Sequence, residues 1–113
     1  MVPQCKKTNE TEWKNIELIN NWENYDTANY PPAQFKKIEN HIFLRGLIKR
    51  TSGSSEIIGV LPEGNRPYTT MYSIVNSNDT FGSAYAEKNG AIRIHDVSNN
   101  VWVDISGINF FID

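Results

Sequence analysis

The sequence of 113 residues has little cysteine, little histidine and no long apolar run. A single cysteine, Cys5, cannot form a disulfide within the chain and excludes a zinc site built from several cysteines. No stretch approaches the roughly 18 apolar residues that a membrane-spanning helix needs, and the N-terminus lacks the apolar core of a signal peptide. We therefore expect no membrane insertion, and a protein that either stays where it is made or leaves by a route other than secretion.

Strong charge and known catalytic motifs are also missing. Eleven basic and thirteen acidic residues give a formal charge of −2, which is too weak a field to predict nucleic-acid binding. There is no G-x-S-x-G, P-loop or H-E-x-x-H motif. The only histidines, His41 and His95, fall in different predicted hairpins, which disfavours a metal site. We expect no enzyme activity, no metal and no other cofactor, since a chance pair among thirteen acidic residues is weak evidence for a glycosidase.

What the sequence does have is asparagine, glycine and proline between short apolar segments. Fourteen asparagines suit turns, and turns recur about every eight to twelve residues. Hairpins are predicted around Glu39-Asn40 and, with a type I′ turn, around Asn89-Gly90. Residues 15–25 favour a strand over a helix. The pattern predicts an all-β antiparallel sandwich of about eight to ten short strands, with residues 1–12 as a mobile lead-in and residues 13–113 as one domain.

Residues 41–49 are predicted to form a single strand. Its alternating residues place one set of side chains on each face, and both faces carry large apolar groups: Ile42, Leu44, Gly46 and Ile48 on one, Phe43, Arg45, Leu47 and Lys49 on the other. We therefore expect this strand to be covered on both sides. Arg45, in mid-strand, is expected to pair with a carboxylate.

A possible ligand-binding face lies between Ala91 and Ile105. Alternation assigns Ile92, Ile94, Val101, Val103 and Ile105 to the core, and leaves polar groups and an indole on the other face and in the turn. An indole beside fixed polar groups suits a sugar, because it offers a stacking surface and directional partners for hydroxyls. The candidate saccharide-binding residues are Arg93, His95, Asp96, Asn99, Trp102 and Asp104. Burial of Trp102 against another subunit or a loop is the alternative.

A second aromatic-rich stretch contains Trp22, Tyr25 and Tyr30 beside Pro31-Pro32. We expect these rings to pack in the core or at an interface rather than to contact a ligand.

Five segments, in this order, resemble a known family: WKNIELINNWENY, HIFLRGLIK, LPEGNRP, NGAIRI and WVDISGINFFID. Together they are similar to the C-terminal module of phage and prophage tail proteins of Gram-positive bacteria, the receptor-binding proteins of baseplates and tail fibres. The resemblance covers residues 13–113. Two positions depart from the family pattern: Asn21 stands where glycine is usual, and Asn65 where tyrosine is usual.

The resemblance implies a jelly-roll-like β-sandwich at the distal end of a tail fibre or baseplate protein. It implies a homotrimer that binds host cell-surface saccharide without catalysis, contacts other tail or baseplate proteins, and is located in the virion tail. The alternative is a structural cap that forms the trimer and has no ligand of its own. An enzyme that degrades surface polysaccharide is a third, less favoured reading.

The resemblance also implies a role for residues 61–67, LPEGNRP, as a rigid corner between the two sheets. Pro62 and Pro67 fix φ, and Gly64 or Asn65 can supply the positive φ of a tight reversal. Arg66 can tie the loop's carbonyls or a carboxylate on a neighbouring strand, with direct ligand contact as the alternative.

Overall fold

A computed structural model describes residues 12–51 and 55–112. This part of the chain contains eleven strands and no helix. The predicted lead-in, apart from Glu12, and Cys5 lie outside the described residues. The strands are β1 (Lys14–Asn15), β2 (Trp22–Asn24), β3 (Gln34–Ile38), β4 (His41–Arg45), β5 (Leu47–Arg50), β6 (Ile57–Val60), β7 (Met71–Ser77), β8 (Thr80–Ala86), β9 (Ala91–His95), β10 (Trp102–Asp104) and β11 (Asn109–Phe111).

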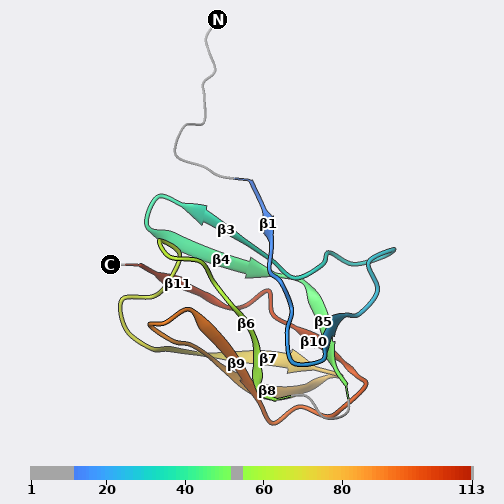
Figure 1. Cartoon of the computed structure of the whole chain (residues 1–113). Helices are drawn as coiled ribbons and strands as arrows, with labels where there is room; N and C mark the ends of the chain where they lie inside the picture. Colours follow the sequence, from blue (N-terminus) through green and yellow to red (C-terminus); the bar gives the residue numbers. More distant parts are fainter. Residues whose placement is uncertain (1–11, 52–54, 113) are drawn as a thin grey trace, which may run out of the picture.

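The strands form two antiparallel sheets that face each other across the core. One sheet has the order β1-β3-β4-β11, and the other has the order β2-β5-β10-β7-β8-β9-β6. Figure 1 shows the β3–β4 pair in one layer and β7, β8 and β9 in the other. The all-β antiparallel sandwich is therefore confirmed, with one strand more than the expected range. Its most deeply buried side chains include Ile42, Leu44, Phe110, Ile48, Ile92, Ile94, Val103 and Ile105.

A two-stranded ribbon passes from one sheet to the other at Gly46. β4 and β11 pair in the four-stranded sheet, and their continuations β5 and β10 pair in the seven-stranded sheet. Gly46 has φ +133°, and a Cβ there would lie 2.5 Å from the Pro32 carbonyl oxygen. The Gly46 carbonyl accepts a hydrogen bond from the Ile105 amide at 3.0 Å, which keeps the two strands together through the bend. Glycine is required because no other residue combines this φ with so close a backbone approach.

This bend corrects the single strand predicted for residues 41–49. Its core face is as expected, since Ile42, Leu44 and Ile48 are buried, but the other face is only half-buried. Arg45 has no carboxylate partner within the described residues. Its Nε donates to Gln34 Oε1 at 2.8 Å, and its guanidinium lies 4.1 Å from the ring centre of Trp13.

Residues 15–25 form two short strands in different sheets rather than one. Asn20 and Asn21, with φ of 59° and 66°, make the turn between β1 and β2. Asparagine tolerates this left-handed backbone, so Asn21 can stand where the family pattern has glycine. Trp22 is 4% exposed, and its indole nitrogen donates to the Ser55 carbonyl at 2.7 Å.

The hairpin turn predicted at Glu39-Asn40, between β3 and β4, is confirmed, since Ile38 lies opposite His41. The type I′ turn predicted at Asn89-Gly90 is wrong: only Gly90 has positive φ there. The Glu87 amide donates to the Ala91 carbonyl at 2.9 Å and the Gly90 amide to the Glu87 carbonyl at 2.8 Å, which is a type I turn followed by a glycine bulge. A two-residue turn with positive φ at both positions occurs instead between β7 and β8, at Asn78-Asp79.

The loop of residues 61–67 contains a type II turn. The Asn65 amide donates to the Pro62 carbonyl at 3.1 Å, and Gly64 has φ +89° at the position where this turn requires it. Arg66 Nε donates to the Leu61 carbonyl at 2.8 Å. The loop joins β6 to β7 within the seven-stranded sheet. The predicted corner between the two sheets is therefore wrong, because the sheet change occurs at Gly46.

Substitution of the two glycines should separate backbone strain from backbone collision. A Cβ at Gly64 would meet no atom within 4 Å, so φ strain is the expected cause of a loss of about 1–3 kcal/mol in the free energy of unfolding of Gly64→Val. Gly46→Ala adds a collision with backbone atoms, and strain and overpacking together should cost about 2–5 kcal/mol. Chemical denaturation measures both. A smaller loss for Gly46→Ala than for Gly64→Val would contradict this account of the bend.

Candidate functional site

A cleft of about 440 Å³ opens on the outside of the Gly46 bend. It collects residues from distant parts of the sequence: the loop after β2, the start of β5, the middle of β7, and β10 with the turn that follows it. The lining residues are Tyr25, Tyr30, Pro31, Gly46, Leu47, Asn76, Trp102, Asp104 and Ser106.

The aromatic side of the cleft is built by a fixed loop. The Leu47 amide donates to the Pro31 carbonyl at 3.2 Å, and the Tyr25 amide donates to the Leu47 carbonyl at 2.9 Å, so both ends of the loop are attached to β5. The Asp26 carboxylate accepts from the Ala28 amide and from the Asn29 side chain. These bonds hold Tyr25 and Tyr30 with ring centres 6.4 Å apart and with 39% and 47% of their surfaces exposed.

The polar side of the cleft comes from adjacent strands. Asp104 on β10 lies opposite Asn76 on β7 and opposite Leu47 on β5. Asp104 Oδ1 accepts the Ser106 amide at 2.9 Å. The second carboxylate oxygen of Asp104 has no hydrogen-bond partner within the residues that the structure describes. The cleft thus combines aromatic walls with an oriented acceptor, and the Asn76 side chain can donate and accept.

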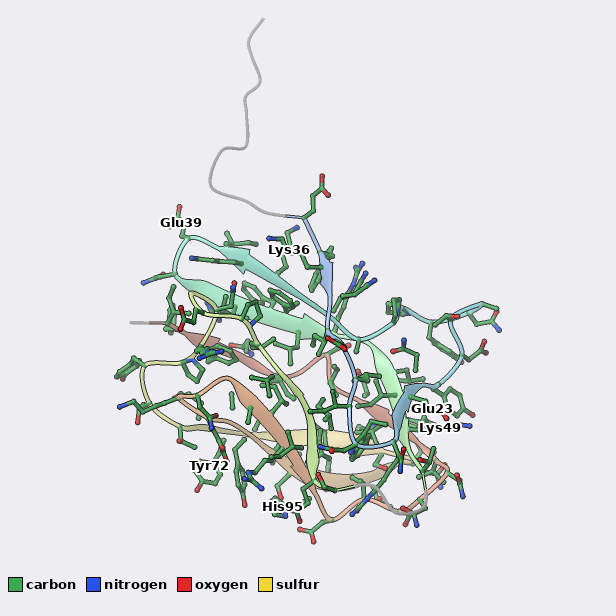
Figure 2. The ribbon with its side chains drawn as sticks, viewed as in Figure 1. Glu23, Lys36, Glu39, Lys49, Tyr72 and His95 are labelled. Atoms are coloured by element: carbon green, nitrogen blue, oxygen red, sulfur yellow. The ribbon has the colours of Figure 1, made fainter. Side chains whose placement is uncertain are left out.

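Lys49 and Glu23 lie close to the cleft. Lys49 is directly opposite Trp102 in the sheet, and its Nζ lies 3.9 Å from Glu23 Oε1. Figure 2 shows these two side chains together, on a different part of the surface from Tyr72 and His95. Both partners are partly exposed, so the pair contributes little to stability; its relevance is that Glu23 offsets the charge of Lys49.

The saccharide site predicted from the sequence is divided by the fold. Arg93 and His95 are on β9, Asp96 and Asn99 are in the turn after it, and Trp102 and Asp104 are on β10. Strands β7 and β8 stand between β9 and β10, so the continuous binding hairpin that was expected is wrong. The reason is that β10 pairs with β5 and β7, and not with the strand that precedes it in sequence. Only Trp102 and Asp104 lie in the cleft.

The β9 residues Arg93 and His95 contact carboxylates of neighbouring elements. His95 Nδ1 lies 2.6 Å from Glu56 Oε2, and the His95 ring packs 4.8 Å from that of Tyr85. Arg93 Nε lies 2.5 Å from Glu87 Oε2. His95 therefore has a packing role that alternation alone does not reveal.

Tyr25 and Tyr30 were expected to be packed away, together with Trp22. Only Trp22 belongs to the core, while both tyrosines face the cleft. The signal for this was present in Asp26 and Pro31-Pro32, which fix an exposed loop around the two rings.

An uncharged apolar patch lies next to the cleft on the outer face of the seven-stranded sheet. Tyr72 and Ile74 of β7 and Phe81 of β8 are 73%, 68% and 80% exposed. Phe81 is opposite Asn76, so the patch begins where the cleft ends. Its alternation is visible in residues 71–77 of the sequence. Exposed apolar side chains grouped in this way mark interaction surfaces.

The described residues contain no group of three or more histidine, cysteine, aspartate or glutamate side chains that could hold a metal ion. They also contain no helix that is long and apolar enough to cross a membrane.

The fold is similar to the crystal structure of the receptor binding protein (gp15) of Listeria phage PSA, with a TM-score of 0.77 over 94% of this chain and 68% of that chain. The sequences are 17% identical, so this likeness shows the fold. No protein-family model matches the chain, and no curated protein matches it.

The environment of His95 leads to a test of stability. His95→Ala removes the contacts with Glu56 and Tyr85, and we expect a loss of about 1–2 kcal/mol in the free energy of unfolding. Asn99→Ala, in the exposed turn that follows, should change it by less than about 0.5 kcal/mol. Thermal and chemical denaturation measure both. Equal stability of the two variants would show that the Glu56–His95–Tyr85 contacts are not structural.

Proposed function

We propose that this protein is a non-catalytic receptor-binding head of a phage or prophage tail, and that the cleft beside Trp102 binds host cell-surface saccharide. The observation that carries the proposal is the cleft itself, where Tyr25, Tyr30 and Trp102 meet the acceptor groups of Asp104 and Asn76. The likeness in fold to a phage receptor binding protein supports the tail assignment. On this proposal the protein is located in the virion tail and contacts other tail or baseplate proteins.

The chemistry of the cleft suits a sugar better than a flat apolar ligand. A pyranose has an apolar face of C–H groups that stacks on a ring, and hydroxyls at its edge that need directional partners. The aromatic side chains provide the stacking surface. Asp104, Asn76 and Ser106 provide the directional partners for the hydroxyls. Stacking contributes on the order of 1 kcal/mol beyond buried area, and each neutral hydrogen bond about 0.5–1.5 kcal/mol. A single cleft therefore binds weakly.

A site that binds weakly needs several linked copies to give strong adhesion. The apolar patch of Tyr72, Ile74 and Phe81 supports self-association of the chain. The outward side chains that β7 and β8 place on this face carry no charge: Tyr72, Ile74, Asn76, Phe81, Ser83 and Tyr85. Such a face can lie on a three-fold axis, against two other copies of the chain, without burying unpaired charge. We propose a homotrimer formed through this patch, which would link three clefts on one rigid head and raise the overall affinity.

The second candidate function is a structural cap that forms a trimer and binds no ligand. The apolar patch favours it equally, because a cap needs the interface and not the cleft. The two functions differ in one respect: a cap has no use for two exposed tyrosines held on a hydrogen-bonded loop beside an unpaired carboxylate oxygen.

Adhesion to cells tests the saccharide site. Trp102→Ala and Tyr30→Ala should each reduce binding of the labelled protein to susceptible Gram-positive cells by about tenfold, because each removes a stacking surface and the loss is repeated in every copy. Tyr68→Ala removes an aromatic side chain that is 59% exposed outside the cleft, and should leave adhesion unchanged. Melting temperature and oligomer size are measured alongside. Undiminished adhesion of both cleft variants at normal stability would favour the cap.

Light scattering tests the assembly. At micromolar concentration we expect about three times the chain mass of 12.9 kDa. Phe81→Lys should reduce this to the single-chain mass while the far-UV spectrum stays unchanged, because a charge in the interface would be buried without a partner. Lys88→Ala, on the β8–β9 turn, is the control. A monomeric parent protein would remove the proposed trimer and leave the patch free.

A further inference from the structure

The sign of the charge in the cleft restricts which saccharide it can bind. Among the described residues that line the cleft, Asp104 is the only charged one, and it is acidic. Lys49, the cation that lies opposite Trp102 in the sheet, is offset by Glu23 at 3.9 Å. Asp26, in the loop between the two tyrosines, adds a further negative charge beside the cleft. Nothing in the lining compensates Asp104.

The aromatic walls of the cleft also favour a cationic ligand over an anionic one. The faces of aromatic rings carry partial negative charge and attract cations, with Trp and Tyr the strongest. Tyr25, Tyr30 and Trp102 all belong to the lining. Aromatic rings and a carboxylate in the same cleft both attract an ammonium group, the rings through their faces and the carboxylate through a charge-assisted hydrogen bond.

Asp104 is held with one oxygen available. Oδ1 is occupied by the Ser106 amide at 2.9 Å, which fixes the side chain, and the second oxygen has no partner among the residues described. Asp104 is half-buried, so its field is less screened than that of a surface carboxylate. A phosphate or uronate entering the cleft would be repelled, whereas an ammonium group would form a charge-assisted hydrogen bond.

We propose that the cleft selects a saccharide that carries a protonated amino group and discriminates against anionic saccharides. This inference rests on the proposed function, since it names the class of sugar for the same cleft. The recognition elements are the free oxygen of Asp104 for the ammonium group, and the rings of Tyr25, Tyr30 and Trp102 for the ammonium group and the sugar face.

The test is an NMR titration of the 113-residue protein with three matched probes. Glucosamine, N-acetylglucosamine and glucuronate are compared at about pH 6, where a free amine is protonated, and the indole N–H signal of Trp102 reports binding. Glucosamine should bind about tenfold more tightly than N-acetylglucosamine, and glucuronate should not bind measurably. Asp104→Asn should abolish the advantage of glucosamine without unfolding the protein, since the new side chain still accepts the Ser106 amide. Glu63→Gln, on the exposed loop after β6, removes the same charge elsewhere and should preserve the advantage.

The outcomes separate this inference from the proposed function. Equal binding of glucosamine and N-acetylglucosamine, or tighter binding of glucuronate, would overturn the inference and leave saccharide binding in place. If none of the probes binds while Trp102→Ala still abolishes adhesion to cells, the inference is overturned and the proposed function stands. If no probe binds and adhesion is unaffected by Trp102→Ala, both are overturned.

Discussion

The bend at Gly46 is the constraint on which the two-sheet arrangement depends. At this residue the β4–β11 pair of one sheet continues as the β5–β10 pair of the other. The backbone of Pro32 and Ala33 lies so close that a Cβ on Gly46 would collide with it. Leu44 and Ile48 lie on either side of Gly46 in the sequence, and both belong to the buried cluster between the sheets. The glycine thus allows one ribbon to contribute to both sheets around a common core.

The same bend produces the candidate site. Gly46 and Leu47, at the bend, and Ser106, beside it, belong to the lining of the cleft. The loop from Tyr25 to Pro31 then attaches to β5 through backbone hydrogen bonds and supplies an aromatic wall. The cleft needs no separate structural element, because it follows from how the chain changes sheets. Its shape is therefore as rigid as the core behind it, and rigid placement of weakly interacting groups lowers the entropy cost of binding.

Local patterns in the sequence predicted most strands and the hairpins between adjacent strands β3–β4 and β8–β9, but not the pairing of strands distant in sequence. Alternation in residues 91–105 correctly assigned Ile92, Ile94 and Val103 to the core, because the side-chain period of a strand is local. It placed Arg93 and His95 beside Trp102 wrongly, because strand order is set by pairing between distant segments. The β5–β10 pairing joins residues more than fifty positions apart, and no turn signal records it. The Gly46 bend was missed for a related reason: the backbone that excludes a side chain there comes from residues 32–33.

The difference between local alternation and long-range pairing also explains why only part of the site was predicted from the sequence. Trp102 and Asp104 were found because they alternate with buried residues on one strand. Tyr25 and Tyr30 were noticed but assigned to packing, since nothing local shows that residues near position 30 face residues near position 104. A binding site made by distant segments is invisible to local patterns when each segment has an ordinary structural explanation. The site becomes visible only in the folded structure, where Asp104, one oxygen of which accepts the Ser106 amide, lines the same cleft as Tyr25, Tyr30 and Trp102.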